Sequence, residues 1–381
     1  MEVYSPELLW VVIIGFIISF VLAFGVGAND VANSYGTSVG SGVLTFQQAC
    51  VLATIFETAG SILLGYKVSD TMRKGILDVT LYEGEEKELM LGMVAALSGS
   101  AVWLLVATFY RLPVSTTHSI VGSTVGFSLV ARGVEGLNWS ALGGIVLSWV
   151  VSPLLSGIVS GILLTLIKKF IMNAREPLQA GLMALPIIYG LTIFVNVLTV
   201  TLNGSKLLAM ENLEFWEVFA ISVCAMIAVA LFCQLFIVPW QRKKILSEDE
   251  LVEPKMFKNQ IGESVASVST VAASTVSLDA PVLKSQKETN DGNVNKLFHF
   301  LQTLTAVFSS FAHGGNDVSN AIGPLIAIWL IYTDGSVLQK AESPIYLLLY
   351  GGLGMCAGLW LLGRRVNDTI GKNITKITPT T

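Results

Sequence analysis

The residues best suited to chemistry form a short polar motif that the chain carries twice. The first copy reads GANDVANSYG over residues 27–36, and the second reads GGNDVSNAIG over residues 314–323. Each copy contains a carboxylate, an amide residue directly before it and another amide residue three positions after it. These residues are Asn29, Asp30 and Asn33 in the first copy, and Asn316, Asp317 and Asn320 in the second.

Carboxylate and amide oxygens suit a hard monovalent cation such as Na⁺, whereas amide N–H groups can donate to an anion. A carboxylate in an apolar segment costs several kcal/mol, so it usually faces a pathway and has a partner. The motif therefore predicts a pair of sites for ions. The alternative interpretation is that the Asn–Asp pairs only join two helices.

Glycines flank both copies of the motif. Glycine lets a helix unwind and free its backbone N–H and C=O groups. We therefore expect the helices to break at these glycines, which are Gly27, Gly36, Gly314, Gly315 and Gly323.

A second group of polar residues lies in RLPVSTTHSIVG, residues 111–122. Pro113 interrupts a helix, and Ser115, Thr116 and Thr117 then place hydroxyl and N–H groups at the start of the next helix. Such a helix N-terminus favours anions. The same pattern is also an ordinary helix cap, so both interpretations remain open for this segment alone.

Glu57, in ATIFETAGS, is a third carboxylate within an apolar stretch. It could bind a cation, carry a proton or pair with a base inside the bundle. His313 and His299 are weaker candidates. The sequence contains no hydrolase, nucleotide-binding or zinc-binding motif, so it predicts neither an enzyme, nor a cofactor, nor a transition-metal site.

Composition predicts the class of protein. The chain is 53% hydrophobic and 13% charged, where soluble domains carry about a quarter charged residues. Its mean hydropathy is +0.68, and its net charge of -4 gives no support to nucleic-acid binding. Apolar stretches of roughly 20 residues recur, which is the length of a membrane-spanning helix. They cover residues 8–24, 46–65, 89–110, 141–167, 182–202, 218–238, 297–311, 321–332 and 345–363, with a shorter one at 118–131.

The chain divides into two apolar parts around one polar segment. We expect an N-terminal membrane half over residues 1–240, a disordered hydrophilic loop over 241–296 and a C-terminal membrane half over 297–381. The basic cluster at 242–244 places that loop in the cytoplasm and the N-terminus outside the cell. Asn138 and Asn203 begin glycosylation sequons and fall on the expected outer side.

Two matched blocks indicate an internal duplication. The Asp motif recurs after 287 residues, and LLGYKVSDTMRKG (63–75) resembles LLGRRVNDTIGKN (361–373) at an offset of 298. Seven crossings and a cytoplasmic loop between the copies would give them opposite orientations, an arrangement typical of secondary transporters. The expected fold is therefore an all-α polytopic membrane protein with two inverted-topology repeats and broken helices. If 118–131 does not cross, the inversion is not predicted.

GANDVANSYGTSVGSG, PVSTTHSIVG and GGNDVSNAIGP resemble the signature segments of the inorganic phosphate transporter (PiT) family, and the central loop resembles its animal sodium-dependent branch. The resemblance implies Na⁺-coupled uptake of inorganic phosphate across the plasma membrane by alternating access. It implies that Asp30, Asn33, Asp317 and Asn320 line a joint phosphate and Na⁺ site. It further implies that residues 115–117 hold phosphate oxygens and that transport needs Glu57.

The chain departs from that family in one respect. Family members carry a second Pro-x-Ser-Thr-Thr-His segment, which the repeat spacing would place at about position 410, whereas the chain ends at Thr381. We therefore expect an incomplete second repeat. Two alternatives stay open, namely a truncated non-transporting membrane sensor, partner or dominant-negative form, and a proton-coupled oxyanion carrier. A homodimer is also left open.

Overall fold

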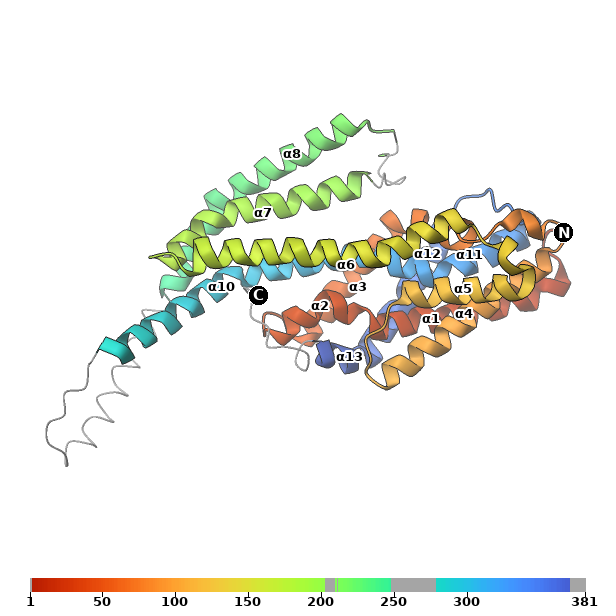
Figure 1. The fold of residues 1–381 in the computed structure, drawn as a ribbon, viewed down its shortest axis with the longest axis horizontal. Helices are drawn as coiled ribbons and strands as arrows, with labels where there is room; N and C mark the ends of the chain where they lie inside the picture. The colour runs from red at the N-terminus through yellow and green to blue at the C-terminus, as the bar shows by residue number, and fades with distance from the viewer. Residues whose placement is uncertain (1, 203–209, 211, 248–278, 371–381) are drawn as a thin grey trace, which may run out of the picture. The chain divides into compact units, whose positions relative to one another are not determined.

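The structure is a computed structural model that describes residues 2–202, 210, 212–247 and 279–370, with side chains omitted for 279–291. Apart from one isolated bridge between Leu77 and Leu137, the described residues form helices and their connections. The main helices are α1 (Leu9–Asn29), α2 (Val31–Gly40), α3 (Phe46–Asp70), α4 (Glu86–Phe109), α5 (Thr116–Arg132), α6 (Trp139–Ile167), α7 (Pro177–Leu202), α8 (Phe215–Phe232), α10 (Asp279–His313), α11 (Ser319–Asp334), α12 (Ile345–Leu362) and α13 (Arg364–Asp368). Figure 1 shows these elements.

Seven helical runs in the described part of the chain are long and apolar enough to cross a membrane. They are Pro6–Gly40, Phe46–Gly75, Glu86–Phe109, Trp139–Met172, Pro177–Leu202, Phe215–Ser247 and Ile345–Leu362. The short stretch at 118–131 is α5, which packs along α4 in the opposite direction. Its far end returns to the segment before α4, where the N–H of Asn138 donates to the carbonyl of Ile76 at 2.9 Å. α5 has 17 residues against the 24 of α4, and its contacts run from Ser119 beside Ser100 to Arg132 beside Glu88, so it lies along the first part of α4.

The chain forms two compact units, and the units do not follow the division expected at residues 240 and 297. The first contains the described residues up to Gly157 and from Gln302 onward. The second contains Ile158–Leu202 and the described residues from Glu214 to Leu301. The first unit crosses the expected boundary because α1 packs against α11 and α12, which come from the other end of the chain.

In the second unit, α7 and α8 pack as a helical pair. Gly190 of α7 lies against Met226 of α8, and the rings of Phe194 and Phe219 meet edge to face with centroids 5.8 Å apart. Small residues let two apolar helices approach closely.

The polar segment is more helical than the sequence analysis predicted. Helix continues past α8 to Ser247, and α10 begins at Asp279, so the described parts of the expected loop, 241–247 and 279–296, are helical. An apolar face explains the helix in the later part of the segment, toward residue 296. It consists of buried residues at helical spacing, namely Val294, Leu297, Phe298 and Leu301. The rest of the predicted loop, 248–278, lies outside the described residues.

The two copies of the motif run in opposite directions in the first unit. The N–H of Tyr4, before α1, donates to the carbonyl of Tyr332 near the end of α11 at 3.0 Å. Further along, the hydroxyl of Ser19 in α1 donates to the carbonyl of Ala321 at the start of α11, also at 3.0 Å. These contacts make α1 and α11 antiparallel, as an inverted repeat requires.

Helix crossings in the first unit occur in equivalent pairs. At each crossing, a glycine of one repeat faces the backbone carbonyl of a residue in the other repeat. The pairs are Gly27 with Met355, Gly314 with Glu57, Gly358 with Phe24, and Gly60 with Phe311. The sequence offsets of 287 and 298 relate these pairs to one another. Gly314 is the counterpart of Gly27, and Glu57 is the counterpart of Met355, so the first two contacts are equivalent. The other two are equivalent in the same way. The repeats are therefore related in their packing as well as in their motifs.

Candidate functional site

Asp30 lies where α1 ends and α2 begins. The interruption involves this single residue, since the Asp30 N–H still bonds to the carbonyl of Val26 at 2.8 Å and the Asp30 carbonyl accepts from the N–H of Asn33 at 2.9 Å. The carboxylate is 2% exposed. Its Oδ2 accepts from the N–H of Thr116 at 3.3 Å and from the Thr116 hydroxyl, whereas Oδ1 has no hydrogen-bond partner among the described residues.

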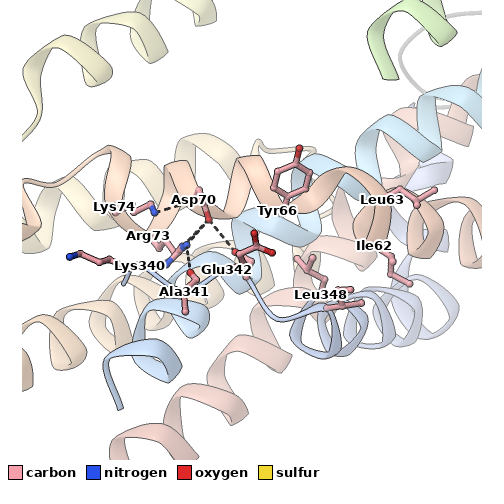
Figure 2. A pocket seen from close by; sticks show the side chains of 12 residues that line it. Ile62, Leu63, Tyr66, Asp70, Arg73, Lys74, Lys340, Ala341, Glu342 and Leu348 are labelled. Carbon is pink, nitrogen blue, oxygen red and sulfur yellow. Dashed lines mark hydrogen bonds and ion pairs between the residues drawn. The ribbon is translucent and has the colours of Figure 1, made fainter. Parts of the chain in front are cut away.

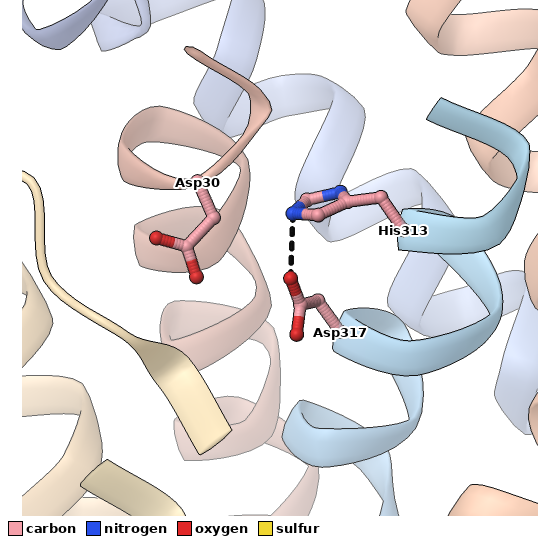
Figure 3. A group of neighbouring side chains, drawn as sticks. All are labelled: Asp30, His313 and Asp317. Atoms are coloured by element: carbon pink, nitrogen blue, oxygen red, sulfur yellow. Dashed lines mark ion pairs between the residues drawn. The ribbon is translucent and has the colours of Figure 1, made fainter. Parts of the chain in front are cut away.

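Asp317 lies in η8 (Gly314–Val318), a π-helical turn that joins α10 to α11 without interruption. Its Oδ1 accepts from the side-chain amides of Asn320 at 2.9 Å and Asn316 at 3.2 Å. Figure 3 shows the carboxylate of Asp317 close to that of Asp30.

His313 connects the carboxylates of the site. Its Nε2 lies 2.5 Å from Oδ2 of Asp317, and its Nδ1 lies 3.2 Å from Oε1 of Glu57. Glu57 is 2% exposed and also accepts from the hydroxyl of Ser310 at 3.3 Å. Ligand atoms of Asp30, His313 and Asp317 all lie within 4.8 Å of one another. His313 thus links Glu57 of α3 to Asp317 of the second motif, and Asp30 of the first motif lies close by.

From the sequence alone, His313 is one of the weaker candidates. It lies four residues before Asp317, on the same side of the helix, and this spacing could have identified it. Comparison of the repeats gives a second signal, because the equivalent residue in the first copy is Val26. Glu57 likewise has Met355 as its counterpart. The ionisable pair therefore occurs on only one side of an otherwise symmetric core.

The Ser-Thr-Thr segment joins the two motifs. Thr116 contacts Asp30, and the Thr117 hydroxyl accepts from the side-chain amide of Asn320 at 2.7 Å. Ser115 is exposed and caps α5, with its hydroxyl accepting from the N–H of His118 at 3.4 Å. The ring of His118 stacks on Trp149, with centroids 3.9 Å apart.

The remaining amides differ in their positions. The Asn29 side-chain amide donates to the Thr108 hydroxyl and the Leu112 carbonyl, both at 3.0 Å, and its oxygen accepts from the N–H of Val114 at 3.1 Å. Asn29 therefore fixes the loop before α5, as the alternative interpretation of the motif required. Asn33 and Asn316 are exposed.

The five glycines of the motifs all lie within helices, and none has a positive φ. The prediction that they break the helices is wrong, because the one interruption falls at Asp30. Their role is close packing. A Cβ at Gly36 would lie 2.9 Å from the side chain of Ile370, and a Cβ at Gly323 would lie 2.6 Å from the side chain of Met72.

The polar atoms of the site favour a hard cation. Oδ1 of Asp30 and Oδ1 of Asn320 are buried oxygen acceptors without a donor among the described residues. Buried acceptors of this kind need a donor or a positive charge. With the carboxylate of Asp317 they supply an oxygen-dominated environment, which suits Na⁺ better than a soft transition metal.

Comparisons with known proteins identify the family of the chain. A family model described as "Phosphate transporter family" matches residues 26–381. The chain is 37% identical to sodium-dependent phosphate transporter 2 of Felis catus, across 97% of this chain and 86% of that protein. It is 36% identical to sodium-dependent phosphate transporter 1 of Homo sapiens, across 98% of this chain and 85% of that protein.

A solved structure titled "The sodium-dependent phosphate transporter" superposes with a TM-score of 0.77 and 34% identity, covering 97% of this chain and 80% of that chain. The prediction of an all-α polytopic membrane protein is confirmed. The matched residues contain both Asp motifs and the Ser-Thr-Thr segment. The chain belongs to the phosphate transporter family.

Proposed function

We propose that the protein is a Na⁺-coupled symporter that imports inorganic phosphate across the plasma membrane by alternating access. One observation carries this proposal. Two buried carboxylates from antiparallel copies of one motif face each other beside the hydroxyl-rich start of α5, and buried oxygen acceptors near them have no donor in the described part of the chain.

Na⁺ binds between the carboxylates in this proposal. Asp30, Asp317 and Asn320 supply oxygen ligands, and Glu57 acts through His313, which holds Asp317 in place. Asn29 contributes by fixing the loop before α5, and Asn316 by its hydrogen bond to Asp317.

Phosphate binds at the N-terminus of α5. The hydroxyls of Ser115, Thr116 and Thr117 are donors for its oxygens, and the exposed amide of Asn33 is another. The positive end of the helix dipole also favours an anion at this position. Thr116 now donates to Asp30, so a cation on Asp30 would free this hydroxyl for the anion.

This geometry gives a physical reason for coupling. Two carboxylates repel an anion, and the repulsion is strong where water is excluded. Na⁺ offsets part of this negative charge, so phosphate binds well only after the cation. Obligatory order of this kind is what a symporter needs.

The inverted repeats supply the basis for alternating access. An antiparallel pair of related helices can adopt two related packings that open the site to opposite sides of the membrane. In this proposal the N-terminus is extracellular, and Asn138 lies on the outer side as a glycosylation candidate. Asn138 is exposed, and the other candidate, Asn203, lies outside the described residues.

Uptake of radiolabelled phosphate tests the proposal. Cells expressing the chain at their surface are assayed in Na⁺ and in choline at several pH values. Uptake that needs Na⁺ at every pH supports the proposed coupling. Uptake that continues in choline and increases at acid pH would indicate a proton-coupled carrier instead.

A further inference from the structure

A polar pocket lies away from the proposed ion site, between the end of α3 and the start of α12. It encloses about 330 Å³ and is shown in Figure 2. Its walls combine charged residues from η2 (Thr71–Gly75) and the loop before α12 with apolar residues from both helices. Nothing in the proposed transport cycle uses this pocket.

A buried arginine builds the polar wall. Arg73 is 1% exposed, and its guanidinium donates to the carbonyls of Gln339 at 2.7 Å and Ala341 at 3.0 Å. It also donates to Oδ1 of Asp70 at 2.8 Å, and the same oxygen accepts from the Ser343 hydroxyl at 3.2 Å. These bonds fasten the loop to α3, so the pocket has a fixed shape.

The charges around the pocket leave an excess of one positive charge. Arg73, Lys74 and Lys340 face two acids, Asp70 and Glu342. Asp70 is shared between Arg73 and Lys74, whose Nζ lies 3.6 Å from its Oδ2. The pocket therefore complements an anion that carries one negative charge.

The opposite wall is apolar. Ile62 and Leu63 of α3 and Ile345 and Leu348 of α12 line it. Ile55, which is 56% exposed, lies two turns before Ile62 on the same side of α3 and extends the apolar surface along the helix. Both helices belong to runs of membrane-spanning length, and the pocket lies where α3 ends and α12 begins. The ends of helices of this length reach the region of the lipid phosphates.

We propose that this pocket binds a membrane phospholipid. Its phosphodiester lies against Lys74 and Lys340, and one acyl chain follows Ile62 toward Ile55. A phosphodiester carries the single negative charge that the pocket complements. A free phosphate ion would use the lysines and leave the apolar wall uncovered, so the lipid satisfies both walls.

Native mass spectrometry of the purified full chain tests this site. The protein in detergent is titrated with phosphatidylglycerol, and the lipid-bound fraction is recorded. Substitution of both lysines, Lys74→Gln with Lys340→Gln, should raise the half-saturating lipid concentration at least about tenfold, because each lysine near a lipid phosphate contributes to affinity. Lys67→Gln is the matched control. Lys67 is an exposed lysine on α3, about one turn before Asp70, and it does not line the pocket. Its substitution should change the half-saturating lipid concentration by less than about twofold.

Two further probes separate the sources of the anion. Diacylglycerol with the same chains should show no saturable binding, and millimolar inorganic phosphate should not displace the lipid. Equal affinity of the double variant and the parent, or displacement by phosphate, or diacylglycerol binding as tightly as the phospholipid, would each overturn the proposal. Ile62→Gln keeps the test valid if the lysine variant folds poorly, since it should weaken lipid binding through the apolar wall alone.

Discussion

The glycine crossings between the repeats make a quantitative prediction about Gly314. This residue lies where η8 crosses α3, and an added Cβ would lie 2.5 Å from the Cα and 2.6 Å from the carbonyl carbon of Glu57. Contacts below 3.0 Å with backbone atoms cannot be relieved by rotating a side chain. Gly314→Ala must therefore push α3 away from the second motif.

The size of the effect follows from two opposing terms. Overpacking of this kind costs about 1–3 kcal/mol. Alanine gains up to ~1 kcal/mol over glycine in a helix interior, which offsets part of the cost. We expect a net loss of about 1–2 kcal/mol in the free energy of unfolding, or roughly 2–8 °C in Tm for a unit of this size.

Thermal unfolding of the purified protein in detergent measures this change. Gly126→Ala, in α5, is the matched control, because a Cβ there would have no neighbour within 4 Å. It should leave the Tm unchanged or raise it. Gly27→Ala, at the equivalent crossing, should lower the Tm about as much as Gly314→Ala. If Gly314→Ala and Gly126→Ala had the same Tm, the argument from close crossings would be refuted.

Three further predictions concern the polar contacts of the first unit. His313→Ala leaves the carboxylates of Glu57 and Asp317 without their shared partner, so phosphate uptake by surface-expressed protein should fall roughly tenfold or more; uptake within twofold of the parent would contradict the bridging role. Asn29→Ala leaves the N–H of Val114 unpaired and should destabilise the protein by about 1–3 kcal/mol, measured by thermal unfolding. Unchanged stability would show that Asn29 does not fix the loop. Arg73→Leu removes a buried cation that holds the loop before α12, so it should cost roughly 2–5 kcal/mol and expose that loop to limited proteolysis. Resistance to protease equal to that of the parent would show that Arg73 does not hold this loop in place.

Much of the fold could be predicted because its signals are local. Membrane-spanning length and apolar composition are properties of single segments, and the matched blocks at offsets of 287 and 298 already indicated two related units. The direction of the repeats was also predictable, provided that residues 118–131 crossed as a helix. The contacts that relate the repeats could not be predicted, since Gly27 and Met355 lie far apart in the chain.

The site was predicted unevenly for a related reason. Residue type and duplication identified Asp30 and Asp317, which the structure brings close together. The sequence could not distinguish Asn29, which fixes a loop, from Asn320, which faces the site, because both lie in the same motif. The sequence also could not identify His313 as part of the site, because its contact with Glu57 forms only when α3 packs beside the second motif.

The most direct test of the account is phosphate uptake, with and without external Na⁺, in cells that express residues 1–381 or its Asp30→Asn and Asp317→Asn variants at equal surface levels. The account predicts Na⁺-dependent uptake by the parent chain and its loss in both variants, because each substitution removes one of the two carboxylates that hold the cation. Normal Na⁺-dependent uptake in both variants would contradict it.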